Sequence, residues 1–130
     1  MLDKPGLLLR AEGFAVLTVS VAAYHELNGS WLYFLLILLW PDLFMLGYLA
    51  NVRLGAAMYN LVHTYTWPLL LGSAAVFEQW HTTLLFTLIW TTHIGMDRML
   101  GYGLKYPTFF KDTHLQRVEG IQRKLAEGPA

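Results

Sequence analysis

The chain contains no cysteine. This excludes disulfide bridges, thiolate nucleophiles and cysteine-type zinc sites, so a metal would have to be held by histidine, carboxylate, amide or backbone oxygen. Charge is also scarce: 14% of the residues are Asp, Glu, Lys or Arg, against about 25% in a typical soluble domain. The formal net charge is zero, so nucleic acid is not an expected partner.

Apolar residues take the place of the missing charge. They make up 55% of the chain, and the mean hydropathy is +0.41. Four apolar stretches approach the ~20 residues that cross about 30 Å of hydrocarbon. They run over 6–24, 31–49, 55–77 and 82–100. The short links between them favour antiparallel neighbours. The sequence therefore predicts an all-α bundle of four transmembrane helices (residues 1–104), followed by a cytoplasmic or interfacial tail (residues 105–130).

The first stretch has an alternative interpretation as a secretory signal. Val21, Ala22 and Ala23 resemble a signal-peptidase site after an apolar run. Arg10 and Glu12 interrupt the start of that run, which favours a retained helix.

The basic residues indicate an orientation. With four spans, the N-terminus, the link at 50–54 and the C-terminus lie on one side of the membrane, and all basic residues fall on or near that side. They are Lys4, Arg10, Arg53, Arg98, Lys105, Lys111, Arg117, Arg123 and Lys124. Cytoplasmic loops carry an excess of Lys and Arg, so we expect both termini in the cytoplasm and a multi-pass protein of a bacterial inner membrane.

Four ionisable residues interrupt the apolar stretches: Asp42, His63, His93 and Asp97. At a rise of about 1.5 Å per residue, the first three each lie ~10–12 Å from the cytoplasmic boundary, and Asp97 lies nearer to it. An ionisable group within a membrane span is costly and usually functional. Four at a similar depth therefore indicate a polar site inside the bundle.

The residue types and spacings of this site suit a metal. His93 and Asp97 are four residues apart, so they share one face of a helix. Asp42 follows Pro41, which removes a backbone hydrogen bond and can kink a helix. Two imidazoles and two carboxylates suit one divalent metal, zinc or manganese. The alternative is two buried His–Asp pairs that only fix the packing of the helices.

Further residues could act beside this centre. As catalytic groups we consider Glu12, Asn60, Asp112 and His114; as groups that bind a lipid substrate, Arg98, Tyr102, Lys105 and Tyr106. Gly101, Gly103 and Pro107 are expected to end the last span. Beyond them, Leu115, Val118, Ile121 and Leu125 recur at near-helical spacing, which predicts a short interfacial helix.

The strings PDLFMLGY, YNLVHTYTWP and HIGMDRMLGYGLKYPTFFKDTHL resemble a bacterial family of small integral membrane proteins known only as a domain of unknown function. The order of PD, a histidine on the next helix and HxxxD is also similar to the membrane-bound metal-dependent hydrolases. That similarity implies that Asp42, His63, His93 and Asp97 are metal ligands. Here PDLF lacks the second acid and the histidine of that family's string, so the similarity implies one metal rather than two.

Three functions remain open on these grounds. The first is a metal-dependent hydrolase of a lipid or lipid-linked ester at the inner leaflet. The second is a small carrier or proton relay that uses the same polar layer. The third is a structural or partner-binding membrane protein. Membrane lipid is the expected partner, and a homo-oligomer is compatible with all three functions.

The orientation can be tested with reporter fusions. We expect fusions after Ser30 and Gln79 to report the outer side, and fusions after Asn51 and at the C-terminus to report the cytoplasm, because the basic residues cluster on the cytoplasmic side. Alkaline phosphatase and fluorescent-protein reporters measure the two sides. An outer C-terminus would show that one span is miscounted.

Overall fold

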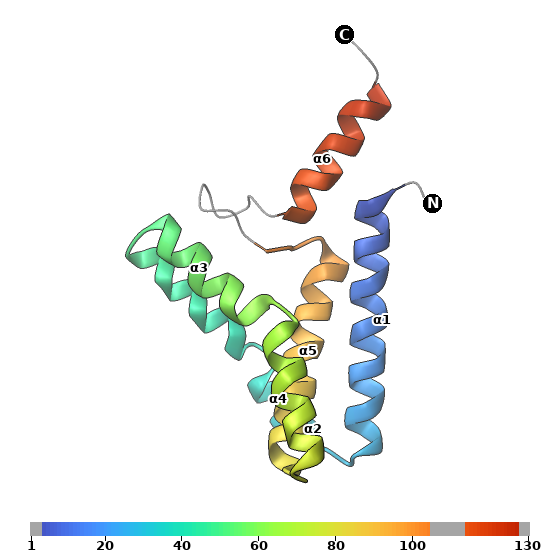
Figure 1. Ribbon diagram of the computed structural model, residues 1–130, viewed down its shortest axis with the longest axis vertical. Coiled ribbons are helices and arrows are strands. Elements are labelled where there is room, and N and C mark those ends of the chain that lie inside the picture. The colour runs from blue at the N-terminus through green and yellow to red at the C-terminus, as the bar shows by residue number, and fades with distance from the viewer. Residues whose placement is uncertain (1–3, 105–113, 128–130) are drawn as a thin grey trace.

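The computed structural model describes residues 4–104 and 114–127, and every regular element in that part of the chain is helical (Figure 1). This confirms the all-α prediction. The elements are α1 (Pro5–Glu26), α2 (Trp31–Ile37), the 3-10 helix η1 (Trp40–Leu49), α3 (Val52–His63), α4 (Thr66–Phe77), α5 (His81–Leu100) and α6 (His114–Glu127).

Helix α5 is the central helix of the fold. Helix α1 packs along it so closely that the two backbones are in van der Waals contact. Gly13 of α1 and Gly95 of α5 face each other at the crossing. A Cβ atom at Gly13 would lie 2.5 Å from Cβ of Arg98 and 2.7 Å from the amide nitrogen of Met99. A Cβ atom at Gly95 would lie 2.8 Å from the carbonyl oxygen of Gly13. Small residues such as these glycines permit the backbones of two helices to approach closely.

The predicted span over 31–49 is divided in the structure. Helix α2 ends at Ile37, and the chain continues as η1 from Trp40. Pro41 has no amide hydrogen and cannot continue the α-helical ladder. The amide of Asp42 instead donates to the carbonyl of Leu39 at 3.1 Å, the spacing of a 3-10 turn.

The predicted span over 55–77 is divided as well. Helix α3 ends at His63, Thr64 is extended with φ −98° and ψ 142°, and α4 begins at Thr66. A continuous helix would place the ring of Pro68 against the carbonyl of Thr64. In the third residue of α4, by contrast, a missing amide hydrogen leaves nothing unpaired. Helices η1 and α3 thus pack together as a hairpin that leaves the axis of α5 at an angle (Figure 1).

By length and composition, one described helix, α1, is long and apolar enough to cross a membrane. Helix α5 has 20 residues, but His93, Asp97 and Arg98 lower its apolar character. The apolar segment Trp31–Phe44 is shorter than a full span.

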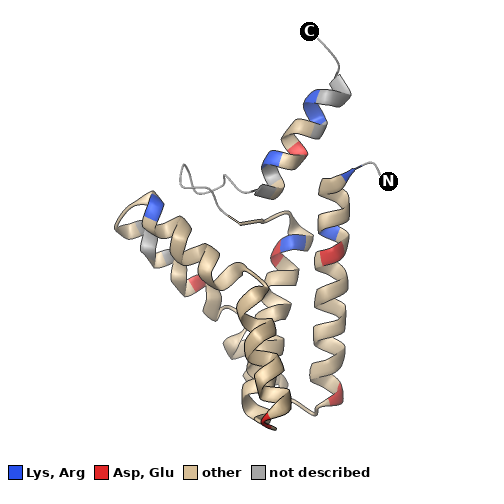
Figure 2. Cartoon of the chain, in the orientation of Figure 1, with Lys and Arg blue, Asp and Glu red and all other residues tan. Residues whose placement is uncertain are grey.

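Charged residues gather at the ends of the molecule (Figure 2). Lys and Arg lie at the end that holds the start of α1, the C-terminal end of α5 and helix α6, and at the tip of the η1–α3 hairpin. At the opposite end, the charged residues among those described are both acidic, Glu26 and Glu78. Between the two ends lies an apolar core in two clusters, one around Tyr24 and Ile89 and the other around Trp90 and Ile94.

The predicted helix of the tail is present as α6, and an ion pair attaches it to α1. Arg10 donates from Nε to Oε1 of Glu119 at 2.6 Å and from Nη2 to Oε2 at 3.0 Å. The guanidinium holds the pKa of Glu119 below its usual range. The pair therefore stabilises the docked helix at neutral pH, and the contribution is lost as the pH falls through the lowered pKa. Both side chains are partly exposed, so the stabilisation is modest.

The glycine crossing can be tested with Gly13→Ala. Alanine is the better helix former by about 1 kcal/mol, but its Cβ would meet backbone atoms of α5. Overpacking of this kind costs about 1–3 kcal/mol, so we expect a lower thermal midpoint in detergent. Gly120→Ala is the matched control, since nothing lies within 4 Å of a Cβ there, and it should leave the midpoint unchanged or raise it. Equal midpoints for the two variants would contradict the tight crossing.

Candidate metal centre

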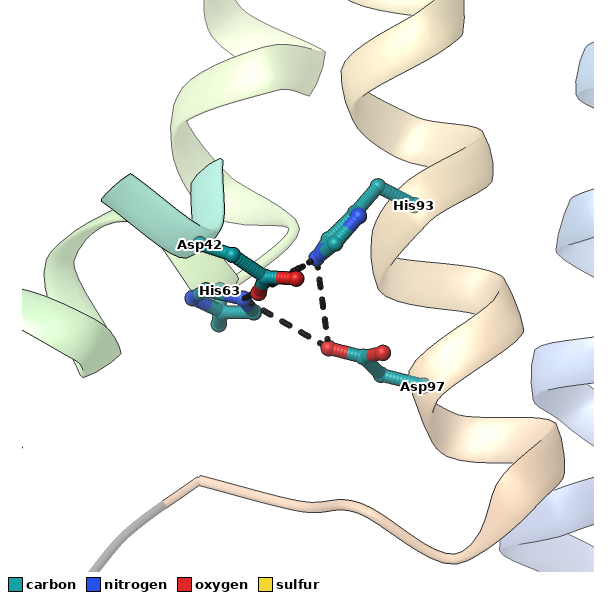
Figure 3. Close-up of side chains that lie close together, drawn as sticks. All are labelled: Asp42, His63, His93 and Asp97. Atoms are coloured by element: carbon teal, nitrogen blue, oxygen red, sulfur yellow. Dashed lines mark hydrogen bonds and ion pairs between the residues drawn. The ribbon is translucent and has the colours of Figure 1, made fainter. Parts of the chain in front are cut away.

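Three elements bring Asp42, His63, His93 and Asp97 together (Figure 3). Asp42 lies in the first turn of η1, directly after Pro41. His63 is the last residue of α3, where the helix breaks before Pro68. His93 and Asp97 lie one turn apart on α5. The two proline-associated breaks therefore position one ligand each, and α5 supplies the other two.

The four side chains present one atom each to a common point. Nε2 of His93 lies 3.1 Å from Oδ1 of Asp42 and 3.4 Å from Oδ2 of Asp97. Nε2 of His63 lies 3.3 Å and 3.5 Å from the same two oxygens. The two Nε2 atoms are 3.2 Å apart. All four residues offer ligand atoms within 4.8 Å of one another.

These separations match the edges of a small coordination tetrahedron. Zinc bonds to nitrogen and carboxylate oxygen at ~2.0–2.2 Å, which corresponds to ligand–ligand distances of about 3.3–3.6 Å in a tetrahedral site. Five of the six separations between ligand atoms lie at 3.1–3.5 Å, and all four ligand atoms lie within 4.8 Å of one another. The donor atoms therefore surround a space that one ion of this size could occupy.

The other nitrogen of His63 fixes its tautomer. Nδ1 lies 2.8 Å from the carbonyl oxygen of Tyr59. A carbonyl oxygen only accepts, so Nδ1 carries the hydrogen and the neutral ring presents a lone pair at Nε2. The ring of Tyr59 also stacks on the imidazole, with centroids 3.6 Å apart and planes 6° apart. Metal-binding histidines usually have this support, in which the ring nitrogen that does not bind the metal donates a hydrogen bond to a nearby acceptor.

Three of the four residues of the centre are buried. His63 and His93 are fully buried, and Asp97 is 9% exposed. The side chain of Asp42 is 39% exposed, so access from outside is through Asp42. His93 differs from His63 in one respect: its Nδ1 is buried without a hydrogen-bond partner among the described residues.

Arg98 supports the centre from the next position on α5. It is 7% exposed and donates from Nη2 to the carbonyl of His63 at 2.8 Å and from Nη1 to the carbonyl of Tyr102 at 3.0 Å. It thereby caps the last residue of α3 and ties the end of α5 to it. The sequence suggested Arg98 as a substrate-binding residue; in the structure two of its donors are occupied by the protein's own backbone.

The remaining candidates lie apart from the centre or outside the described residues. Glu12 is exposed on α1 and lines a pocket with Tyr65 and Arg98. Asn60 is half-buried on α3, one turn before His63. The side chain of Tyr102 is 45% exposed. The predicted roles of Lys105, Tyr106 and Asp112, and of the His114 side chain, concern positions outside the described part of the structure.

Sequence reasoning missed Tyr59. Besides supporting His63, its hydroxyl lies 3.4 Å from Oδ2 of Asp97, so it contacts two of the four ligands. The signal was available, because Tyr59 precedes His63 by four residues and must share its helix face. Trp90 was also missed; it donates from Nε1 to the carbonyl of Val62 at 2.6 Å and holds α3 against α5.

Comparison with models of known protein families assigns most of the chain to one family. Residues 6–118 match the model described as "Domain of unknown function (DUF4260)", and the chain belongs to this family. No curated protein and no solved structure matches it significantly.

The role of the hydrogen bonds from Arg98 to the carbonyls of His63 and Tyr102 can be tested with Arg98→Gln. The change leaves the buried carbonyl of His63 without its donor, at a cost of about 1–3 kcal/mol. We expect a clearly lower thermal midpoint in detergent. Tyr102→Phe is the control, because Arg98 contacts only the backbone of Tyr102. A normal midpoint for Arg98→Gln would show that the guanidinium is not needed for folding and would return it to the substrate-binding candidates.

Proposed function

We propose that this protein is a multi-pass membrane metalloprotein that holds one divalent metal, zinc or manganese, in the centre of Asp42, His63, His93 and Asp97. The observation that carries the proposal is the convergence of four ligand atoms at the spacing of a coordination sphere.

Hydrogen bonding alone accounts poorly for this convergence. Without a metal, each of the five short separations between ligand atoms would need a hydrogen atom on one of the two atoms, directed at the other. If both rings were protonated at Nε2, two hydrogens would have to serve all five contacts. One divalent ion at the centre serves every ligand at once, and it also neutralises the two carboxylates. A buried charge has to be paired with an opposite charge or to coordinate a metal.

A membrane location is supported by the surface of the protein. Large apolar side chains are exposed along α1, α2, η1 and α4, among them Val19, Leu36, Leu46, Leu70 and Phe77. Exposed apolar area on this scale marks a partner or membrane surface. The basic end of the molecule (Figure 2) fits the cytoplasmic side by the positive-inside rule. The centre would then lie within the membrane, nearer to the cytoplasm.

Hydrolysis of a lipid or lipid-linked ester is a second candidate function. It is favoured by the exposure of Asp42, which leaves one side of an otherwise buried centre accessible. A bound divalent metal supplies Lewis-acid chemistry for ester hydrolysis. Glu12 lies outside the cluster of potential ligands, and we propose it, or Asp112 with His114, as the base. Release of a fluorescent fatty acid from a phospholipid substrate, lost in Asp42→Asn, would test this activity.

The metal itself is tested by elemental analysis and melting. Protein purified without a polyhistidine tag or chelator should contain about one zinc or manganese per chain. Added metal should raise the thermal midpoint, because a ligand of the folded state alone stabilises it by about 2.7 kcal/mol at a hundredfold excess over Kd. Absence of both metal and shift at neutral pH would leave a proton relay or a structural cluster.

The double variant His93→Leu with Asp97→Leu is the matched control. Replacing both members of a buried pair by apolar residues is often neutral for stability, whereas removing one leaves the other unpaired at a cost of ~3–5 kcal/mol. We therefore expect a folded protein that neither carries metal nor responds to it. A double variant that still binds metal with wild-type stoichiometry would place the metal elsewhere.

A further inference from the structure

The side chain of Tyr59 contacts two of the four potential ligands, and these two ligands come from different helices. Tyr59 lies on α3, one turn before His63, and is 3% exposed. His63 belongs to the same helix, whereas Asp97 belongs to α5. A buried side chain that contacts both ligands can fix the position of one relative to the other.

The first contact orients the imidazole of His63. The phenol ring of Tyr59 lies flat against it, with ring centroids 3.6 Å apart and an angle of 6° between the planes. The backbone carbonyl of Tyr59 also accepts the hydrogen bond from Nδ1 of His63 at 2.8 Å. Rotation of the imidazole about its Cβ–Cγ bond would drive the ring edge into the phenol and break this hydrogen bond. Nε2 of His63 is therefore held in one direction, toward Asp42 and Asp97.

The second contact restrains the carboxylate of Asp97. The hydroxyl of Tyr59 donates to Oδ2 of Asp97 at 3.4 Å, which is long for a hydrogen bond between two oxygens. Oδ2 is also the oxygen that lies 3.5 Å from Nε2 of His63 and 3.4 Å from Nε2 of His93. The hydroxyl thus holds the oxygen that faces both histidines. It opposes the rotation that would bring both carboxylate oxygens to a metal.

These two restraints bear on the choice of metal, because zinc and manganese need different surroundings. Structural zinc sites have four ligands in a tetrahedral arrangement, with nitrogen and carboxylate oxygen among the usual donors. Manganese suits octahedral sites built from carboxylate, carbonyl and water oxygen. In this centre it would need further ligands, such as water or the second oxygen of a carboxylate. The ring and the hydroxyl of Tyr59 occupy the space beside His63 and Asp97, so further ligands are opposed on that side.

From this arrangement we infer that Tyr59 is the positioning residue that makes the centre selective for zinc over manganese. It acts through His63 and Asp97 and is not one of the four potential ligands. The inference rests on the proposed metal centre and identifies the metal that this centre takes. Loss of the Tyr59 hydroxyl should weaken zinc more than manganese, because the restrained donors suit zinc, whereas manganese gains from a mobile carboxylate.

The experiment compares the affinities of both metals in wild-type protein and in Tyr59→Phe, which removes the hydroxyl and keeps the stacked ring. Full-length protein in detergent is stripped of metal. Zinc and manganese are then titrated separately, each in competition with a chelator of known affinity. Changes to groups that support metal ligands typically cost 10–100-fold in affinity. We therefore expect zinc to bind about tenfold more weakly in Tyr59→Phe, with a smaller loss for manganese.

Cobalt gives an independent readout of the number of ligands, because four-coordinate Co²⁺ absorbs visible light far more strongly than six-coordinate Co²⁺. Wild-type protein loaded with cobalt should show the strong absorption. Tyr59→Phe should absorb more weakly, because the second carboxylate oxygen or a water adds a ligand. Weak absorption in the wild type would show that the centre admits further ligands beside Tyr59, and it would overturn the inference.

Tyr102→Phe is the matched control. It removes the same hydroxyl from a side chain that is 45% exposed and should leave both affinities unchanged. A general loosening of the fold in Tyr59→Phe would weaken zinc and manganese by the same factor, so an unchanged ratio of the two affinities would overturn the inference while the metal centre stands. Wild-type protein that binds neither metal would contradict the metal centre itself, and the inference with it.

Discussion

The missing amide hydrogens of Pro41 and Pro68 determine the course of the chain. Each proline falls in an apolar stretch that would otherwise form one continuous helix, and each ends the α-helical ladder beside it. Between the two breaks, η1 and α3 form a hairpin that departs from the axis of α5 (Figure 1). The breaks also place Asp42 and His63 at helix ends, where they face α5. The irregular backbone and the polar cluster are therefore parts of one arrangement.

Three faces of helix α5 contact four neighbouring elements. One face carries His93 and Asp97 toward η1 and α3, another carries Gly95 against Gly13 of α1, and a third packs α4 through Thr87 and Gly72. Arg98, at the C-terminal end, contacts the carbonyl of His63 and also lines a pocket with Glu12 and Tyr65. Because so many contacts converge on one helix, substitutions on α5 are expected to disturb more than the site that they alter.

The helical class followed from composition, and the His/Asp cluster that could hold a metal was anticipated from the polar positions within the apolar stretches. Apolar stretches indicate helices, and the interval between His93 and Asp97 puts both on one face. The division of two stretches did not follow, although Pro41 and Pro68 were visible, because membrane helices often tolerate proline as a kink. The contact of Tyr59 with His63 was readable from their spacing within α3, but the contact of Tyr59 with Asp97 and the hydrogen bond from Arg98 to His63 depend on how α3 meets α5. Such packing depends on residues far apart in the chain, which periodicity within one segment does not report.

The partial exposure of Asp42 has a kinetic consequence. Its three partners are buried on α3 and α5, whereas Asp42 lies on a short 3-10 helix, a geometry with weaker hydrogen bonds than an α-helix. The η1 segment can therefore open at a lower free energy than the α1–α5 pair can separate, because local openings range from near zero up to the global stability. An ion held by these four residues would exchange at the rate of that local opening. Its residence time would then be set by η1, whereas its affinity would depend on all four ligands.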